Sequence, residues 1–168
     1  QISTPLRLRG GLWQYRCINQ FMVRLPVPEI SDPAHQALTD LATKASVVSH
    51  ERYVLHEQVR HRILTDLGDG THTLNQKLSA WWRLDFRTFR VELRKALKTD
   101  LPLKERAEWE AALAGWQTEH QTLTRRLVDL ETAVNDRVDH RFALTSAERR
   151  TLDDHMRHVM IDYPLGEV

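Results

Sequence analysis

Histidines give this chain its first candidates for metal binding or acid–base chemistry, since nine of them occur in 168 residues. The run His56-Glu57-Gln58-Val59-Arg60 begins like the helix of a zinc protease, but Arg60 stands where the second histidine ligand belongs. His155 and His158 lie three residues apart beside Asp154, and no third ligand is in view. Surface or core histidines are the better interpretation, so we predict no metal site.

Other catalytic patterns are equally weak. The sequence has no glycine-rich phosphate loop, no nucleophile elbow and no Cys-His arrangement. The nearest approach to a nuclease pattern is Asp85 with Glu92 and Arg94 or Lys95, on a segment that needs its neighbouring residues for packing. We therefore predict no catalytic, cofactor-binding or metal-binding residue, and no enzyme activity for this chain itself.

Basic residues are the stronger candidates, and the first group surrounds the turn Gly10-Gly11. Residues 1–28 hold four arginines and no acid. Arginine and glutamine side chains form paired hydrogen bonds to base edges in the major groove of DNA. An edge strand protected by charges is an equally good alternative. The predicted base or phosphate contacts in this segment are Arg7, Arg9, Gln14 and Arg16.

A second basic group lies in residues 77–98, which hold seven cations against Asp85 and Glu92. If the segment is one helix, five of its cations fall within about 80° of one another on a helical wheel, beside the apolar face. Such a stripe fits DNA phosphates. Alternatively, glutamates of the next helix, such as Glu108, pair with these cations. The predicted phosphate contacts are Arg83, Arg87, Arg90 and Arg94.

The elements that position these cations are predicted to be long helices. Apolar or amphipathic residues recur at a 4,3 spacing in two segments, which indicates two narrow seams and a coiled-coil-like antiparallel hairpin. The upstream seam is Leu38, Leu41, Ala45, Val48, Arg52, Leu55, Val59 and Arg62 or Ile63. The downstream seam is Trp109, Leu113, Trp116, His120, Leu123, Leu127, Leu130, Val134 and Val138.

Start and stop signals divide the chain into two parts. Residues 1–30 are expected to be the end of a β-containing recognition domain, with short strands at Leu12–Arg16 and Phe21–Leu25. Residues 31–168 are expected to form a helical domain, with helices at about 33–67, 73–99, 103–140 and 146–162. Capping boxes at 73–76 and 145–148 mark two of these helix starts. The predicted fold is thus mainly α with a small N-terminal β segment.

Composition narrows the function classes further. The net charge of +1 gives no global argument for nucleic acid. No secretory signal and no apolar run of about 20 residues occurs, so we expect no membrane association. A single cysteine, Cys17, forms no internal disulfide, which favours a cytoplasmic protein. Because the chain starts at Gln1, we expect it to be a fragment or a processed product.

Short runs along the chain resemble the C-terminal region of type IIG restriction-modification enzymes and related adenine-specific DNA methyltransferases, which act in bacterial defence. Arg9-Gly10-Gly11, Ile18–Phe21 and Leu25–Ile30 are similar to the close of their target-recognition domain. The other similar runs are Leu78–Phe86, Pro102–Glu110 and Tyr163–Val168, together with Asn135, Phe142, Leu144-Thr145 and Glu148.

The resemblance implies a C-terminal portion of a larger SAM-dependent DNA methyltransferase. Asp162-Tyr163-Pro164 does not match that family's catalytic motif and its glycine-rich cofactor loop is absent, so SAM is implied only for the parent enzyme. The implied role is to hold and read double-stranded DNA beside the upstream methyltransferase domain. The alternative is a structural spacer or subunit-docking arm without DNA contact, and self-association through the helical seam stays open. Arginines of residues 83–98 that face glutamates of the third helix would favour the alternative. Arginines that lie on an open concave face with Arg7 and Arg16 would favour DNA contact.

Overall fold

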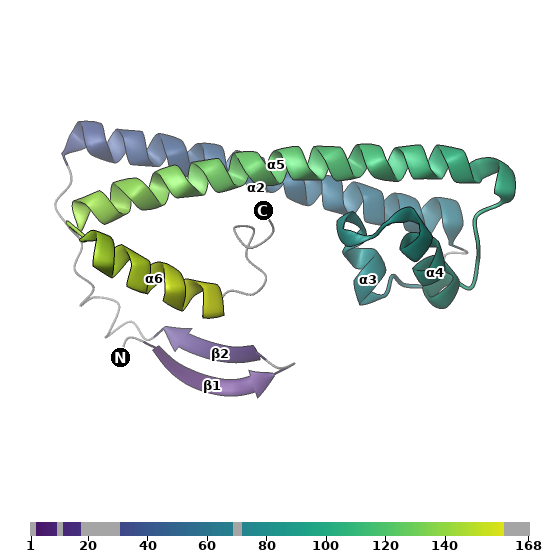
Figure 1. Cartoon of the computed structure of the whole chain (residues 1–168), viewed down its shortest axis with the longest axis horizontal. Coiled ribbons are helices and arrows are strands. Elements are labelled where there is room, and N and C mark those ends of the chain that lie inside the picture. The colour runs from purple at the N-terminus through teal and green to yellow at the C-terminus, as the bar shows by residue number, and fades with distance from the viewer. Residues whose placement is uncertain (1–2, 10–11, 18–30, 69–71, 160–168) are drawn as a thin grey trace. The chain divides into compact units, whose positions relative to one another are not determined.

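The computed structural model describes residues 3–9, 12–17, 31–68 and 72–159, with the side chains of residues 31, 33–68, 72–152 and 154. The chain divides into two compact units, residues 1–32 and 33–168, and each is described by itself (Figure 1). The described part is mainly α-helical. None of the helices in that part is long and apolar enough to cross a membrane.

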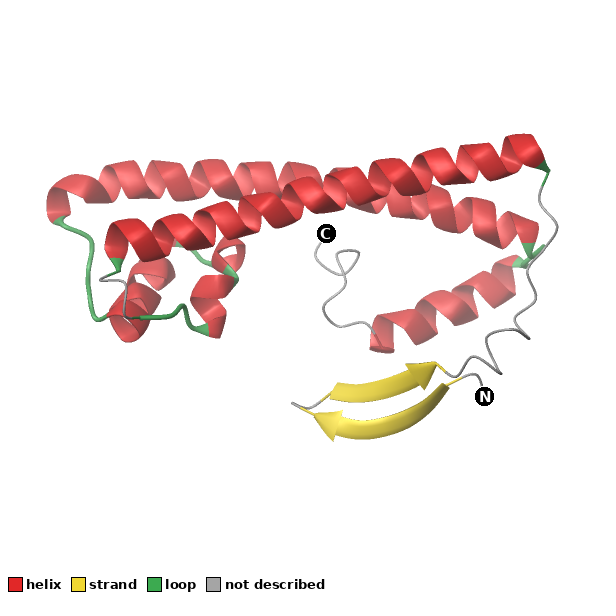
Figure 2. Cartoon of the chain, turned by 180° about the vertical axis from the view of Figure 1, so that it is seen from behind, coloured by secondary structure: helices red, strands yellow, loops and turns green. Residues whose placement is uncertain are grey.

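The first unit holds two antiparallel strands, β1 (Ser3–Arg9) and β2 (Leu12–Cys17), drawn in yellow in Figure 2. Leucine and arginine alternate in the second half of β1, a period-2 pattern typical of a strand. The sequence predicted strands at 12–16 and 21–25 instead, so it missed β1. Residues 21–25 lie outside the described part of the chain.

Two helices of 36 residues each, α2 (Asp32–Leu67) and α5 (Arg106–Arg141), dominate the second unit (Figure 1). At 1.5 Å per residue each is about 54 Å long. The Arg52 Nε atom donates a hydrogen bond to Thr124 Oγ1 at 3.0 Å, and the Arg62 guanidinium lies 5.4 Å from the Trp116 ring. The later residue of α2, Arg62, thus contacts the earlier residue of α5, Trp116. The two helices therefore run antiparallel.

The two helices meet along the seams that the 4,3 spacing indicated. The seam residues buried on α2 are Val48, Leu55, Val59 and Ile63, and those buried on α5 are Trp109, Leu113, His120, Leu123 and Leu127. Ile63, rather than Arg62, takes the last core position. Burial fades toward the other end of the hairpin, where Leu38, Leu41, Leu130 and Val134 are only half-buried. The core is therefore concentrated at the end where α2 finishes and α5 begins.

Four short elements fill the connection between the long helices at this end (Figure 1). We call residues 76–105 the cap. Its elements are α3 (Gln76–Ser79), η1 (Trp81–Arg83), α4 (Phe86–Leu97) and η2 (Leu103–Glu105). The prediction of one helix over 73–99 was wrong.

Side chains that restart the helix explain this break. The Asn75 side chain accepts a hydrogen bond from the Leu78 amide at 2.8 Å, so α3 begins at Gln76 rather than at Thr73. The Asp85 carboxylate accepts from the Thr88 amide at 2.7 Å and starts α4 anew. Between them, the Gln117 side chain of α5 donates to the Leu84 carbonyl at 2.7 Å and ties the break to the hairpin.

The break turns apolar side chains of the cap onto the hairpin. The fully buried cap residues are Leu78, Trp81, Phe89, Leu93 and Leu101, and they join Ile63 and Trp109 in one core cluster. Burying side chains of this size contributes roughly 1.5–3 kcal/mol each. The cap is consequently fixed on the hairpin by a core of buried apolar side chains.

The last described helix, α6 (Ser146–Val159), follows a turn in which Ala143 has a φ of 51°. The predicted capping box at its start is confirmed, because the Thr145 amide donates to Glu148 Oε2 at 2.8 Å and the Glu148 amide donates to Thr145 Oγ1 at 3.3 Å. Arg149 reaches back to Asp136 and Asp139 of α5 at 3.2 and 3.3 Å. These ion pairs connect α6 to the end of α5.

Candidate nucleic-acid interface on the cap

Cations outnumber acids two to one on the cap. Its eight cations are Lys77, Arg83, Arg87, Arg90, Arg94, Lys95, Lys98 and Lys104, and its four acids are Asp85, Glu92, Asp100 and Glu105. Arg106, the first residue of α5, adds a further positive charge. Lys77, Lys95 and Lys104 are more than half exposed. A chain with a net charge of only +1 thus carries a local excess of positive charge at one end of its hairpin.

Two of the four acids hold the cap together, and one of them, Glu92, also pairs with two cap lysines, Lys95 at 2.8 Å and Lys77 at 3.7 Å. Asp85 is the N-cap of α4, and the hydrogen bond from the Thr88 amide lowers the pKa of its carboxyl. Glu92 is buried and accepts hydrogen bonds from Lys95 Nζ at 2.8 Å and from Asn75 Nδ2 at 3.1 Å. The bond from Lys95 is the main reason that the pKa of Glu92 lies below its ordinary value.

Asp100 is the centre of a third arrangement, in which three arginines surround one carboxylate. Arg90 binds it through two hydrogen bonds, from Nε to Oδ1 at 3.1 Å and from Nη2 to Oδ2 at 2.8 Å. Arg106 Nη2 lies 3.4 Å and Arg94 Nε 3.6 Å from Oδ2. The hydrogen bonds from Arg90 are the largest cause that lowers the pKa of Asp100. Three positive charges around one negative charge leave a local excess of two.

The structure distributes the predicted arginines differently from a single helical stripe. Arg83 lies on η1, before the break, while Arg87, Arg90 and Arg94 follow one another on α4. Arg87 and Arg94 are exposed, whereas the Arg90 side chain is only 20% exposed and is occupied by Asp100. The continuous stripe of residues 83–98 was therefore wrong, because the helix that would have carried it is interrupted at residues 80–85.

Arg90 and Arg94 do not pair with the glutamates expected on the next helix. Arg90 and Arg94 form their ion pairs with Asp100, which precedes α5. Glu105 is 4.0 Å from its neighbour Lys104. The ion pairs of Arg90 and Arg94 therefore do not meet the condition for the structural alternative. The condition for DNA contact involves the side chains of Arg7 and Arg16, which lie outside the described part of the chain.

Arg7, Arg9, Gln14 and Arg16 fall on the strand pair of the first unit. The backbone register places Arg7 opposite Gln14 and Arg16 opposite Thr4. Their side chains lie outside the described part of the chain, so their roles stay predictions.

Sequence reasoning missed Asp100 and Arg106 as members of this site. Asp100 lies ten residues from Arg90, beyond the turn that ends α4, where Lys98 has a φ of 56°. Helical spacing cannot reveal a contact made across such a turn. The available signal was the position of Asp100 and Arg106 on either side of Leu101-Pro102, a pair that ends a helix because the residue before a proline disfavours helical backbone.

Two histidines of the hairpin, His56 of α2 and His120 of α5, pack against tryptophans of the cap. The His56 ring stacks on Trp82 at 4.1 Å, and the His120 ring lies 5.0 Å from Trp82. Trp81 packs edge-on against both His56 and Trp82. These rings join α2, η1 and α5. Within the described residues, no cluster of three or more histidine, cysteine, aspartate or glutamate side chains could hold a metal ion.

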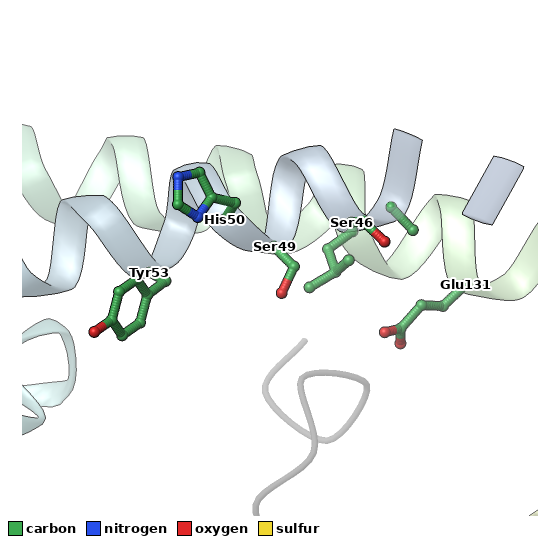
Figure 3. A pocket seen from close by; sticks show the side chains of 7 residues that line it. Ser46, Ser49, His50, Tyr53 and Glu131 are labelled. Carbon is green, nitrogen blue, oxygen red and sulfur yellow. The ribbon is translucent and has the colours of Figure 1, made fainter. Parts of the chain in front are cut away.

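A shallow groove between the long helices is a second surface of interest (Figure 3). Its volume is about 590 Å³, and Ala45, Ser46 and Ser49 of α2 create the hollow because their side chains are small. Ser49 and Tyr53 of α2 and Glu131 of α5 project from the same side of the hairpin (Figure 3). Tyr53 is 59% exposed. The groove lies where the seam becomes thinner.

Comparison with known proteins identifies a family for the helical part. Residues 31–138 match the family described as a domain of unknown function (DUF8810), and the chain belongs to this family. The match includes α2, the whole cap and nearly all of α5, so the hairpin and its cationic cap are parts of one family domain. No curated protein and no solved structure matches the chain.

Proposed function

We propose that this chain is a non-catalytic module that holds double-stranded DNA for a SAM-dependent DNA methyltransferase or restriction-modification enzyme. The observation that supports this proposal most is the excess of cations on the cap, which holds eight lysines and arginines against four acids. Lysines and arginines that neutralise phosphates supply most of the sequence-independent affinity of DNA-binding proteins.

The hairpin suits such a role because it holds the cap firmly. The cap shares a buried core with both long helices, and Gln117 fixes the turn between η1 and α4. Exposed cations on a rigid support lose little conformational freedom beyond that of their own side chains when a duplex binds. The proposed phosphate contacts are Arg87 and Arg94 of α4, with Arg83, Lys77 and Lys104 beside them.

The choice of duplex DNA rests on the resemblance of short runs to type IIG enzymes and adenine-specific methyltransferases. In this proposal the small β segment of the first unit is the end of a recognition domain. Arg7, Arg9, Gln14 and Arg16 would then contact bases or phosphates. SAM and the catalytic residues would belong to an upstream methyltransferase domain.

Salt dependence tests this proposal directly. We expect the chain to bind a labelled random duplex, measured by fluorescence anisotropy, with an affinity that falls steeply from about 50 to about 300 mM salt. Replacing one phosphate contact, as in Arg87→Gln, should flatten the slope of log affinity against log salt by about one unit. A slope that the Arg87→Gln variant leaves unchanged would remove that residue from the interface.

A subunit-docking arm is the second candidate, and the groove beside Tyr53 favours it. A large exposed aromatic side chain next to a hollow between two helices is typical of a surface that receives another helix. In that case Tyr53→Ala should abolish self-association or subunit binding, measured by light scattering and co-purification. The original chain would then show no affinity for DNA, and this result separates the two candidates.

A further inference from the structure

We propose that Arg94 and Arg106, held in place by Asp100, form a seat for one phosphodiester group on the cap. The proposal deepens the proposed function and rests on it, because it names the point at which a single DNA phosphate binds. Arg106 was not among the contacts expected from the sequence.

The hydrogen bonds around Asp100 divide the three arginines into a support and a binding pair. Arg90 uses two donors on Asp100 and is mostly buried, so it anchors the carboxylate. Arg106 donates from Nε to the Leu101 carbonyl at 3.1 Å and from Nη2 to Asp100 at 3.4 Å. The Arg94 side chain is 54% exposed, and only its Nε atom approaches Asp100, at 3.6 Å.

This geometry leaves N–H groups of Arg94 and Arg106 that can donate hydrogen bonds to a ligand. A guanidinium has five N–H groups in a planar fork. Within the described part of the chain, no acceptor binds the two Nη atoms of Arg94 or the Nη1 atom of Arg106. A phosphodiester offers two charged oxygens, and arginine binds such oxygens through parallel hydrogen bonds.

Charge favours an anion at the same place. Arg90, Arg94 and Arg106 share the single negative charge of Asp100, so two positive charges remain uncompensated within the group. A phosphodiester brings one negative charge and relieves the repulsion between the arginines. Asp100 itself would not be displaced, because both of its oxygens accept hydrogen bonds from Arg90.

The support of the seat is rigid. Leu101 is buried, and its amide donates to Asp100 Oδ1 at 2.8 Å while its carbonyl accepts from Arg106. The turn between α4 and α5 therefore fixes the carboxylate and the Arg106 stem together. A preorganised seat binds its ligand with a smaller loss of side-chain entropy than separate surface arginines would.

Substitution by lysine distinguishes a seat from a general positive patch. Arg94→Lys keeps the charge but loses the fork, so a seat that uses paired hydrogen bonds should lose affinity while the salt slope stays the same. Arg94→Gln should lose both affinity and about one unit of slope. Arg126→Gln is the matched control, because Arg126 is exposed on α5, outside the cap, and pairs with Glu51 at 3.7 Å.

We expect duplex affinity at low salt to fall about tenfold for Arg94→Gln and about threefold for Arg94→Lys, with less than about a twofold change for Arg126→Gln. Thermal melting of each variant checks that the fold is intact, and the exposure of Arg94 makes a large change in melting unexpected. Arg106→Lys should behave as Arg94→Lys does. If Arg94→Lys binds as the original chain does, or Arg94→Gln matches Arg126→Gln, the seat is wrong while the DNA proposal stands.

Titration with inorganic phosphate tests the seat even if the chain binds no duplex. The NMR signals of the Arg94 and Arg106 Nε–Hε groups should shift together and saturate, and Asp100→Asn should weaken this response because the support is lost. Absence of a shift at both arginines would overturn the seat. A shift without any duplex binding would keep the seat as a site for a free phosphate group and contradict the proposed function.

Discussion

Glu92 gives the clearest pH prediction at the scale of single residues. Its pKa lies below the ordinary value of 4.5, chiefly because of the hydrogen bond from Lys95, and burial opposes this shift. A carboxyl whose pKa is lower in the folded state stabilises the fold above its unfolded pKa and loses this contribution as the pH falls through the folded pKa. The melting temperature should therefore fall as the pH drops below about 4.5.

Circular dichroism at several pH values measures this effect. Glu92→Gln should melt at a lower temperature than the original chain at pH ~7 but lose less stability on acidification. Glu57→Gln is the control, because Glu57 is exposed and pairs with its helix neighbour Arg60 at 2.7 Å. Asp100, whose pKa is also lowered, should keep part of the acid sensitivity in the Glu92→Gln variant. Equal acid sensitivity in both chains would show that Glu92 has no such role.

The different environments of Arg90 and Arg94 could not be predicted from the sequence. A helical wheel places Arg90 and Arg94 on one face and treats them alike. Asp100 makes them different, since it binds Arg90 through two hydrogen bonds and leaves Arg94 mostly exposed. That contact spans a turn, and helical periodicity carries no information about it.

At the scale of elements, the N-cap of α4 determines how Arg87 and Arg94 are presented. Asp85→Ala removes the side chain that accepts the Thr88 amide and should destabilise the domain by about 1 kcal/mol. Asp85→Asn keeps an N-cap side chain and should stay close to the original stability. Urea denaturation of both variants measures the difference. If the two variants lose the same free energy of unfolding, the Asp85 side chain does not stabilise α4 as described.

The long helices were predicted from the sequence, but the break in the cap was not. The 4,3 spacing extends over nine positions in α5, so it predicts both the extent of this helix and its buried face. Leu78, Trp82, Phe86 and Phe89 also have helical spacing, although they belong to three separate elements. Asp85 was the overlooked signal, because aspartate is unfavourable inside a helix and favourable as an N-cap.

At the scale of the whole helical unit, stability should come mostly from the end that carries the cap. Leu55→Ala removes a side chain that is 5% exposed and should destabilise the unit by about 2–5 kcal/mol. Leu41→Ala makes the same chemical change on the same helix at a half-buried position, so it should cost about 1 kcal/mol or less. Urea unfolding of the two variants compares them. Equal losses would contradict the uneven distribution of the core.

The arrangement of the whole unit was only partly predictable. Two seams of similar length predicted two long helices packed on each other, and their contacts follow an antiparallel order. The concentration of the core at one end depends on Trp81 and Phe89, which reach the hairpin only because the cap folds back. A sequence pattern that describes each helix separately cannot foresee that long-range packing.

The central claim is that cations of the cap bind the phosphates of a DNA duplex. Its most direct test compares two triple variants with the same loss of charge. Arg87→Gln, Arg94→Gln and Lys104→Gln alter the cap, while Arg125→Gln, Arg126→Gln and Arg137→Gln alter exposed positions on α5. Fluorescence anisotropy with a random duplex, from about 50 to about 300 mM salt, should show a slope flatter by about three units for the cap variant and little change for the other. Equal slopes for the two variants, or no duplex binding by the original chain at the lowest salt, would contradict the claim.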